Sequence, residues 1–86
     1  MIHARKDYNR IQDPMGIIPE DEPVFLLRAQ DIAAPEAVIS WIEAHIRHGG
    51  DIDIAKLALD QVMRMKEWQE KHGWKKADIP EGSHER

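Results

Sequence analysis

Two amphipathic segments separated by a pair of glycines constrain the fold of this chain more than any other feature. The first, APEAVISWIEAHIR, carries Pro35 in what would be the first helical turn. Gly49 and Gly50 follow it, and one of them is expected to form a left-handed C-cap. The second, IDIAKLALDQVMRMKEWQEKH, follows directly. The pattern predicts a mostly α fold, an antiparallel helical hairpin over residues 35–48 and 52–72.

Both ends of the second segment carry helix-boundary signals. Asp51 and Asp53 precede or open it, and either carboxylate can cap the first turn. Lys71 and His72 suit the negative end of the helix dipole, and Gly73 ends the pattern. These signals predict that the second helix is the longer of the two.

The second helix has more apolar surface than one neighbouring helix can cover. Its apolar side chains spread over an arc of about 200°, against about 160° for the first helix. The surplus must meet the N-terminal residues, another copy of the chain, or both. We therefore expect a homo-oligomer whose interface residues are Ile54, Leu57, Gln61, Met65 and Trp68. Gln61 either fixes the register of that association or points outward along a groove.

The N-terminal third is predicted to be an irregular arm, because proline and glycine recur at positions 14, 16, 19 and 23. The apolar run that follows cannot be assigned by periodicity alone. An extended segment over about residues 23–30 is favoured, and it would need the arm or another subunit as its pairing partner. A helix capped by Asp21 stays open as the alternative. We expect one small domain, residues 1–86, with flexible ends at 1–7 and 81–86.

Composition excludes several classes of protein. The 86 residues include 12 basic and 16 acidic side chains, interspersed along the chain, for a net charge of −4. That pattern does not fit a protein that binds the phosphate backbone of nucleic acids. No apolar run reaches the roughly 18 residues of a membrane span. We expect a soluble, cytoplasmic protein.

No catalytic or metal-binding set can be assembled from the sequence. There is no cysteine or threonine, and Ser40 and Ser83 lie outside any G-x-S-x-G turn. His45 and His48 have a spacing that can share a metal, but two ligands do not make a site. We therefore expect no enzymatic activity, no metal and no cofactor.

Two short phrases of similar composition are the candidates for a ligand site. RAQD offers a guanidinium fork, an amide and a carboxylate, and NRIQDP repeats these types. Tyr8 and Trp41 add faces on which a ring can stack. The predicted pocket for a small polar or anionic ligand, such as a nucleotide, consists of Tyr8, Arg10, Gln12, Asp13, Arg28, Gln30, Asp31 and Trp41. The structural alternative, in which Asp31 caps the following turn and Arg28 pairs with Asp13 or Glu36, is favoured over the pocket.

Part of the sequence also resembles a group of known small proteins. Residues 8–41 resemble small proteins of phages, prophages and bacterial genomes. The resemblance is carried by R-I-Q-D-P, then I-P-E-D-E-P-V-F-L-L-R-A-Q-D, then A-P and a Trp-containing helix. The resemblance carries no catalytic residue with it. It implies a phage-borne accessory or counter-defence protein that binds host proteins or signalling nucleotides. We therefore expect a non-catalytic binding protein. The alternative is a protein–protein interaction module that docks a host or phage partner through its apolar helix face.

Overall fold

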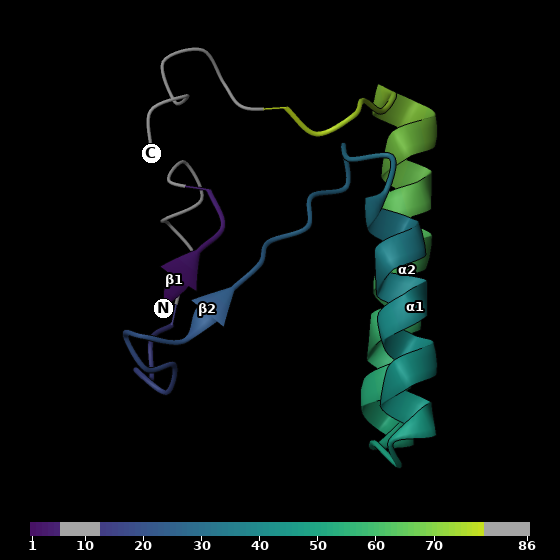
Figure 1. The fold of residues 1–86 in the computed structure, drawn as a ribbon. Coiled ribbons are helices and arrows are strands. Elements are labelled where there is room, and N and C mark those ends of the chain that lie inside the picture. The colour runs from purple at the N-terminus through teal and green to yellow at the C-terminus, as the bar shows by residue number, and fades with distance from the viewer. Residues whose placement is uncertain (6–12, 79–86) are drawn as a thin grey trace. The chain divides into compact units, whose positions relative to one another are not determined.

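A computed structural model describes residues 1–5 and 13–78 of the chain. Two short strands, β1 (Ile2–His3) and β2 (Pro23–Val24), precede two long helices, α1 (Ala34–Arg47) and α2 (Ile52–His72) (Figure 1). The contacts divide the chain into two compact units. Leu27–Ala77 forms the helical unit, and Met1–Leu26 with the residues from Asp78 onward forms the N-terminal unit. The predicted mostly α fold with a helical hairpin is confirmed.

Both ends of α1 lie within one residue of the prediction. Ala33 is the N-cap and makes no side-chain capping bond of its own. Asp31 supplies the acceptors instead: its Oδ1 accepts from the Ala33 N–H at 2.9 Å, and its carbonyl accepts from the Ala34 N–H at 3.0 Å. The helix ends before Gly49, whose φ of 77° is the expected left-handed conformation.

The bounds of α2 agree with the prediction at both ends. Of the two candidate caps, Asp51 is the one used, since its Oδ1 accepts from the Asp53 N–H at 2.7 Å. That bond satisfies one of the amide groups that the first helical turn leaves unpaired. At the other end Gly73 follows His72 with a φ of 82° and donates to the Gln69 carbonyl at 2.8 Å.

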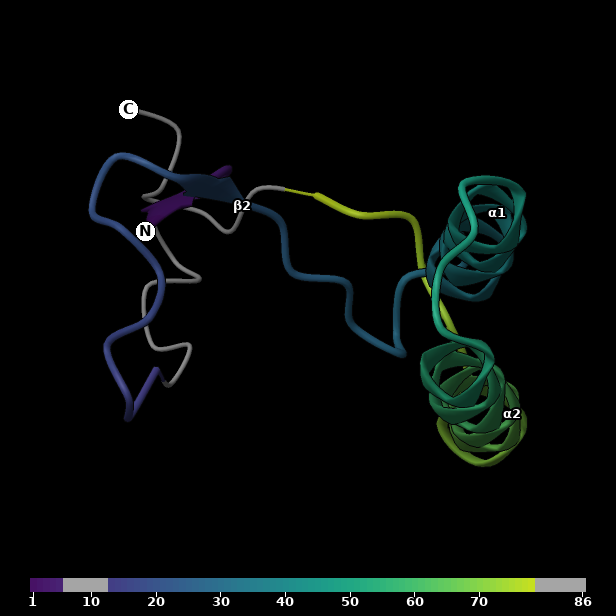
Figure 2. The ribbon, with the colours of Figure 1, turned by 90° about the horizontal axis from the view of Figure 1, so that it is seen from below.

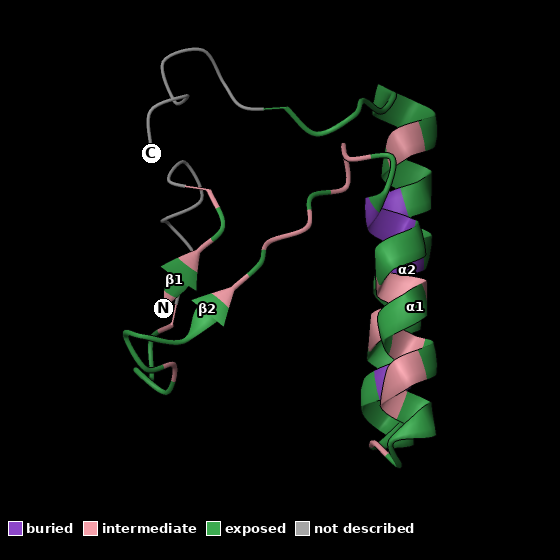
Figure 3. Ribbon diagram, viewed as in Figure 1, coloured by how far each residue is buried: buried purple, intermediate pink, exposed green. Residues whose placement is uncertain are grey.

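The two helices lie side by side along the length of α1, as two views at right angles show, and α2 continues beyond it (Figures 1 and 2). The core is small, and its buried residues are in the hairpin (Figure 3). On α2 the residues turned inward recur every three or four positions, and we call them the seam: Ala55, Ala58, Val62, Met65 and Gln69. This spacing is the one that keeps a single stripe of a helix against a neighbouring helix. The alanines are small, which lets the two backbones approach closely.

The N-terminal unit contains a minimal parallel sheet. Ile2 pairs with Pro23 and His3 with Val24, and the Ile2 N–H donates to the Glu22 carbonyl at 2.7 Å. Of the two conformations left open for residues 23–30, no helix forms; a strand is observed over Pro23–Val24, and Ala29 and Gln30 belong to a turn. Pro23 is tolerated because an edge strand leaves its missing N–H on the unpaired side.

Candidate functional site

The RAQD phrase forms a turn that is fixed by backbone hydrogen bonds. The Asp31 N–H donates to the Arg28 carbonyl at 3.0 Å. The chain beyond α2 returns to this turn, so that the Lys75 N–H donates to the Gln30 carbonyl at 2.8 Å. The Ile32 N–H donates to the Lys75 carbonyl at 3.0 Å. The start of α1 and the end of α2 are thus tied together inside the helical unit.

Gln69 completes this assembly from the last turns of α2. Its Nε2 donates to two carbonyls, that of Ala29 at 2.9 Å and that of Asp31 at 3.1 Å, in a partly buried position. We call the assembly of residues 28–32, Gln69 and Lys75 the joint. The five hydrogen bonds that join the RAQD turn to itself, to Gln69 and to Lys75 all have a backbone carbonyl as acceptor.

Two of the predicted ligand-binding carboxylates accept hydrogen bonds from the backbone. Asp31 holds the Ala33 N–H, which is the capping role of the structural alternative. Asp13 holds the N–H groups of Ile17 at 3.2 Å and Ile18 at 3.0 Å. The Asp13 carbonyl also accepts from the Gly16 N–H at 2.9 Å. The carbonyl and the carboxylate of Asp13 together stabilise a turn in the N-terminal unit.

The remaining predicted ligand-binding residues that the structure describes all lie in the helical unit. Arg28 is exposed, and Gln30 and Asp31 lie beside it in one turn. Trp41, on α1, stacks on His45 with ring centroids 4.7 Å apart and an interplanar angle of 18°. Tyr8, Arg10 and Gln12 lie outside the described residues. The structure therefore brings the RAQD residues together, and their pairing with the NRIQDP phrase stays a prediction.

A cavity of about 150 Å³ lies beside the joint, and aromatic rings supply much of its lining. The rings of Trp68 and His72 lie one turn apart on α2 with centroids 4.6 Å apart. The full lining is Gln30, Trp68, His72, Gly73, Trp74 and Lys75. The hollow is open to solvent on one side, and it has room for a flat ring against these side chains. The lining offers such a ring stacking faces and the hydrogen-bonding amide of Gln30.

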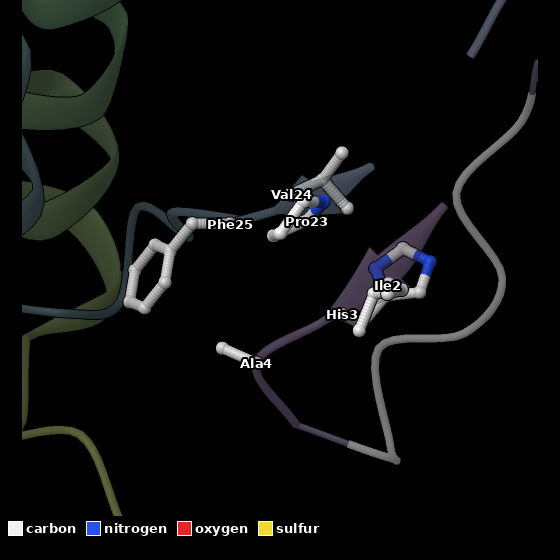
Figure 4. A pocket seen from close by; sticks show the side chains of 6 residues that line it. All are labelled: Ile2, His3, Ala4, Pro23, Val24 and Phe25. Carbon is white, nitrogen blue, oxygen red and sulfur yellow. The ribbon is translucent and has the colours of Figure 1, made fainter. Parts of the chain in front are cut away.

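A second cavity, of about 320 Å³, lies in the N-terminal unit. Its walls come from β1 and β2 and the residue that follows each strand (Figure 4). They are mostly apolar: Ile2, His3, Ala4, Pro23, Val24 and Phe25. His3 Nδ1 is buried and has no hydrogen-bond partner among the described residues. This cavity therefore offers apolar contact and a single ring nitrogen.

One exposed apolar stripe of α2 lies next to the seam and includes most of the predicted interface, whereas Ile52, Leu59 and Met63 are exposed on another side of the helix. We call Ile54, Leu57, Gln61 and Trp68 the row; they fall within about 60° of one another around the helix. Ile54, Leu57 and Trp68 are 49%, 68% and 39% exposed. Gln61 is exposed too, and its Oε1 accepts from Arg64 Nη1 at 3.3 Å. Met65, the fifth predicted interface residue, is buried in the seam.

Gln69 is the residue that the sequence analysis did not single out. A regular spacing could have identified it, because Ala55, Val62 and Gln69 are each seven residues apart. A side chain in phase with two small apolar residues lies on the same stripe of the helix. A polar residue at that phase has to find partners there, and the carbonyls of the RAQD turn supply them.

Two further findings complete the description of these surfaces. Within residues 1–5 and 13–78, no group of three or more His, Asp or Glu side chains is placed to hold a metal ion. No described helix is both long enough and apolar enough to cross a membrane.

No protein-family model matches the chain, and no curated protein or solved structure matches it either.

Proposed function

We propose that this chain is a non-catalytic protein-interaction module, and that its row docks an amphipathic helix. The observation that carries the proposal is the alignment of exposed apolar side chains on one side of α2, Ile54, Leu57 and Trp68, with two of them about half exposed or more. Exposed apolar residues scattered singly over a surface are ordinary, whereas an aligned set marks a contact surface.

The spacing of the row suits a helical partner. Leu57 and Gln61 follow Ile54 by three and seven residues, and Trp68 follows it by fourteen. A helix docked along a groove is contacted at i, i+3 and i+7 positions, which is the same period. Trp68 adds a large side chain of the kind that dominates binding energy at protein interfaces. The row therefore resembles one side of a helix–helix interface whose other side is a partner helix.

A peptide titration tests the proposal. The probe is a fluorescently labelled helical peptide with leucines at the i, i+3, i+7 and i+14 spacing of the row and charged residues elsewhere. We expect the anisotropy to rise with the native protein and to stay flat with Leu57→Glu. Leu59→Glu is the matched control, because Leu59 is also exposed, at 50%, and lies about 160° around the same helix from Leu57. Equal binding by native protein and Leu57→Glu, or no binding at all, would refute the proposal.

A second candidate function is suggested by the aromatic cavity beside the joint. Here we propose that a small planar ligand, such as a nucleotide base, stacks on Trp68 and Trp74 while the Gln30 amide bonds its edge. This proposed site retains one residue, Gln30, of the ligand-binding set predicted from the sequence. It replaces the other RAQD side chains with residues from the end of α2.

Intrinsic tryptophan fluorescence tests the second candidate, with adenosine and AMP as probes. Saturable quenching is expected in the native protein and is expected to weaken in Trp74→Leu and Gln30→Ala. Trp41→Phe, which changes a tryptophan outside the cavity lining, serves as the control. If quenching is linear, or survives both cavity variants, base stacking in this cavity is refuted.

The setting of either function is also a proposal. The resemblance to phage and prophage proteins suggests an accessory role, with the protein working in the cytoplasm. It favours neither the docked helix nor the stacked base.

A further inference from the structure

We infer that the helix docked on the row is α2 of a second copy of this chain, packed antiparallel, with its crossing point beside Gln61. This inference rests on the proposed function, because it names the partner of the same surface. It adds an orientation, a register and a pair of charged edges that hold them.

The row is nearly symmetric about its polar residue. Ile54 precedes Gln61 by seven residues, and Trp68 follows it by seven. In an antiparallel pair related by a twofold axis at Gln61, Ile54 of each copy therefore faces Trp68 of the other. The two Gln61 side chains then meet at the axis, where an amide can both donate to and accept from its equivalent.

The charged residues along the outer edge of the row give the orientation. At about 100° per residue, Asp53, Asp60, Arg64 and Lys71 lie 20–60° beyond Leu57, on the side away from the seam. The two acidic residues occupy the N-terminal half of this edge, and the two basic residues occupy its C-terminal half. Antiparallel packing places the acidic half of each copy against the basic half of the other.

The same edge opposes the parallel arrangement. In a parallel twofold pair this edge lies on opposite sides of the interface in the two copies, so the acidic and basic halves do not meet and their attraction is lost. Both opposite-charge pairs, 53 with 71 and 60 with 64, have their midpoint at position 62. The charged edge and the apolar row thus have centres one residue apart, so one register serves both.

The length of the row sets the expected strength. From Ile54 to Trp68 it spans about 21 Å at 1.5 Å per residue. That contact is at the small end of the range for specific interfaces, and such complexes form and dissociate reversibly. We therefore expect a monomer–dimer equilibrium that depends on concentration and weakens with added salt as the charged edges are screened.

Sedimentation equilibrium over about 1 to 500 µM tests the association. The native protein is expected to shift from monomer to dimer, and Leu57→Glu is expected to raise the dimer dissociation constant about tenfold or more. Leu59→Glu should behave like the native protein. Circular dichroism of each variant establishes that it remains folded, which exposed positions on α2 permit.

Cross-linking tests the orientation, and the absence of cysteine from the chain makes the experiment clean. Asp53→Cys and Lys71→Cys chains are mixed and treated with a short bismaleimide. The antiparallel pair predicts a cross-linked dimer in the mixture and little product from Asp53→Cys alone. A dominant product from Asp53→Cys alone would contradict the antiparallel register and overturn the inference.

The outcomes separate this inference from the proposed function. A chain that stays monomeric at every concentration, yet binds the leucine-spaced peptide through Leu57, overturns self-association and leaves the docking function standing. A monomer that Leu57→Glu unfolds overturns the inference too, because Leu57 would then be needed for the fold of the single chain. A dimer unaffected by Leu57→Glu uses another face and also overturns it.

Discussion

Gln69 shows how one polar side chain can organise a unit with a small core. Its amide lies in the stripe of α2 that faces α1, at a phase otherwise occupied by alanine and valine. It donates two hydrogen bonds to carbonyls of the turn that leads into α1. Because each acceptor is a backbone group, the interaction specifies the path of the chain and depends little on the side chains of the turn.

Replacing Gln69 should therefore cost more than replacing its exposed neighbour. Gln69→Ala leaves the Ala29 and Asp31 carbonyls without these donors in a partly buried place, and we expect the free energy of unfolding to fall by about 1–3 kcal/mol. Urea denaturation followed by circular dichroism measures the change. Glu70→Ala should alter it by less than about 0.5 kcal/mol. Equal values for the two variants would contradict the role assigned to Gln69.

The close approach between Gly50 and His45 gives a second prediction at this scale. The His45 Nε2 and the Asp51 carbonyl are 2.8 Å apart, and Trp41 stacks on the same ring. A Cβ at position 50 would overlap the ring, nearest to Cε1. We expect Gly50→Ala to displace His45 and to destabilise the unit by about 1–2 kcal/mol. In the background His45→Ala, which removes the ring, the same substitution should cost much less; a full cost there would contradict the steric explanation.

At the scale of the elements, two adjacent apolar stripes of α2 have different tasks. The seam packs on α1, and the row beside it is exposed. Periodicity in the sequence predicts the full width of the apolar arc, but not which part of it α1 covers. Which stripe α1 covers depends on the size of the side chains, because Ala55 and Ala58 allow the two helices to approach closely, whereas Leu57 and Trp68 would keep them apart. This is why Met65 was predicted in the interface and lies in the seam.

Adjacent residues on α2 provide a direct test of this division. Val62 is 1% exposed and Met63 is 54% exposed. Val62→Asp places an unpaired charge in the seam, and that penalty exceeds the stability expected of so small a unit. Met63→Asp should change the free energy of unfolding by less than about 0.5 kcal/mol. Far-UV circular dichroism should show loss of helix for the first variant alone; retained helix in Val62→Asp would refute the position of the seam.

The strands were less predictable than the helices, for a physical reason. Helix bounds follow from local signals such as the Asp51 cap and the glycine at position 73, and these placed both helices within one residue. The pairing of β1 with β2 joins residues about twenty positions apart through two backbone pairs. No local pattern encodes a contact of that kind, so the sequence indicated the extended conformation of Pro23–Val24 and left its partner open. The same holds for the candidate site. The capping role of Asp31 was predictable because it involves neighbouring residues, whereas Gln69 contacts residues about forty positions away.

For the whole molecule, the division into two units predicts that the helical unit is independent. The hydrogen bonds described above for its hairpin and joint all lie within Leu27–Ala77. We expect a chain of residues 27–77 to show a helical circular dichroism spectrum and a cooperative thermal transition. Its midpoint should rise with concentration, since dimers stabilise their folded subunits. A random-coil spectrum at all concentrations would show that the N-terminal unit is required for folding.

The hydrogen bonds between Lys75 and the RAQD turn have a consequence for engineering. They hold Asp31 and Lys75, which lie near the two ends of the helical unit, side by side in a single bridge. A unit whose two ends leave from one place can be inserted into an exposed loop of another protein without spreading that loop. Residues 27–77 are therefore suited to transplantation as a compact cassette, which would carry the row of α2 onto a host of choice.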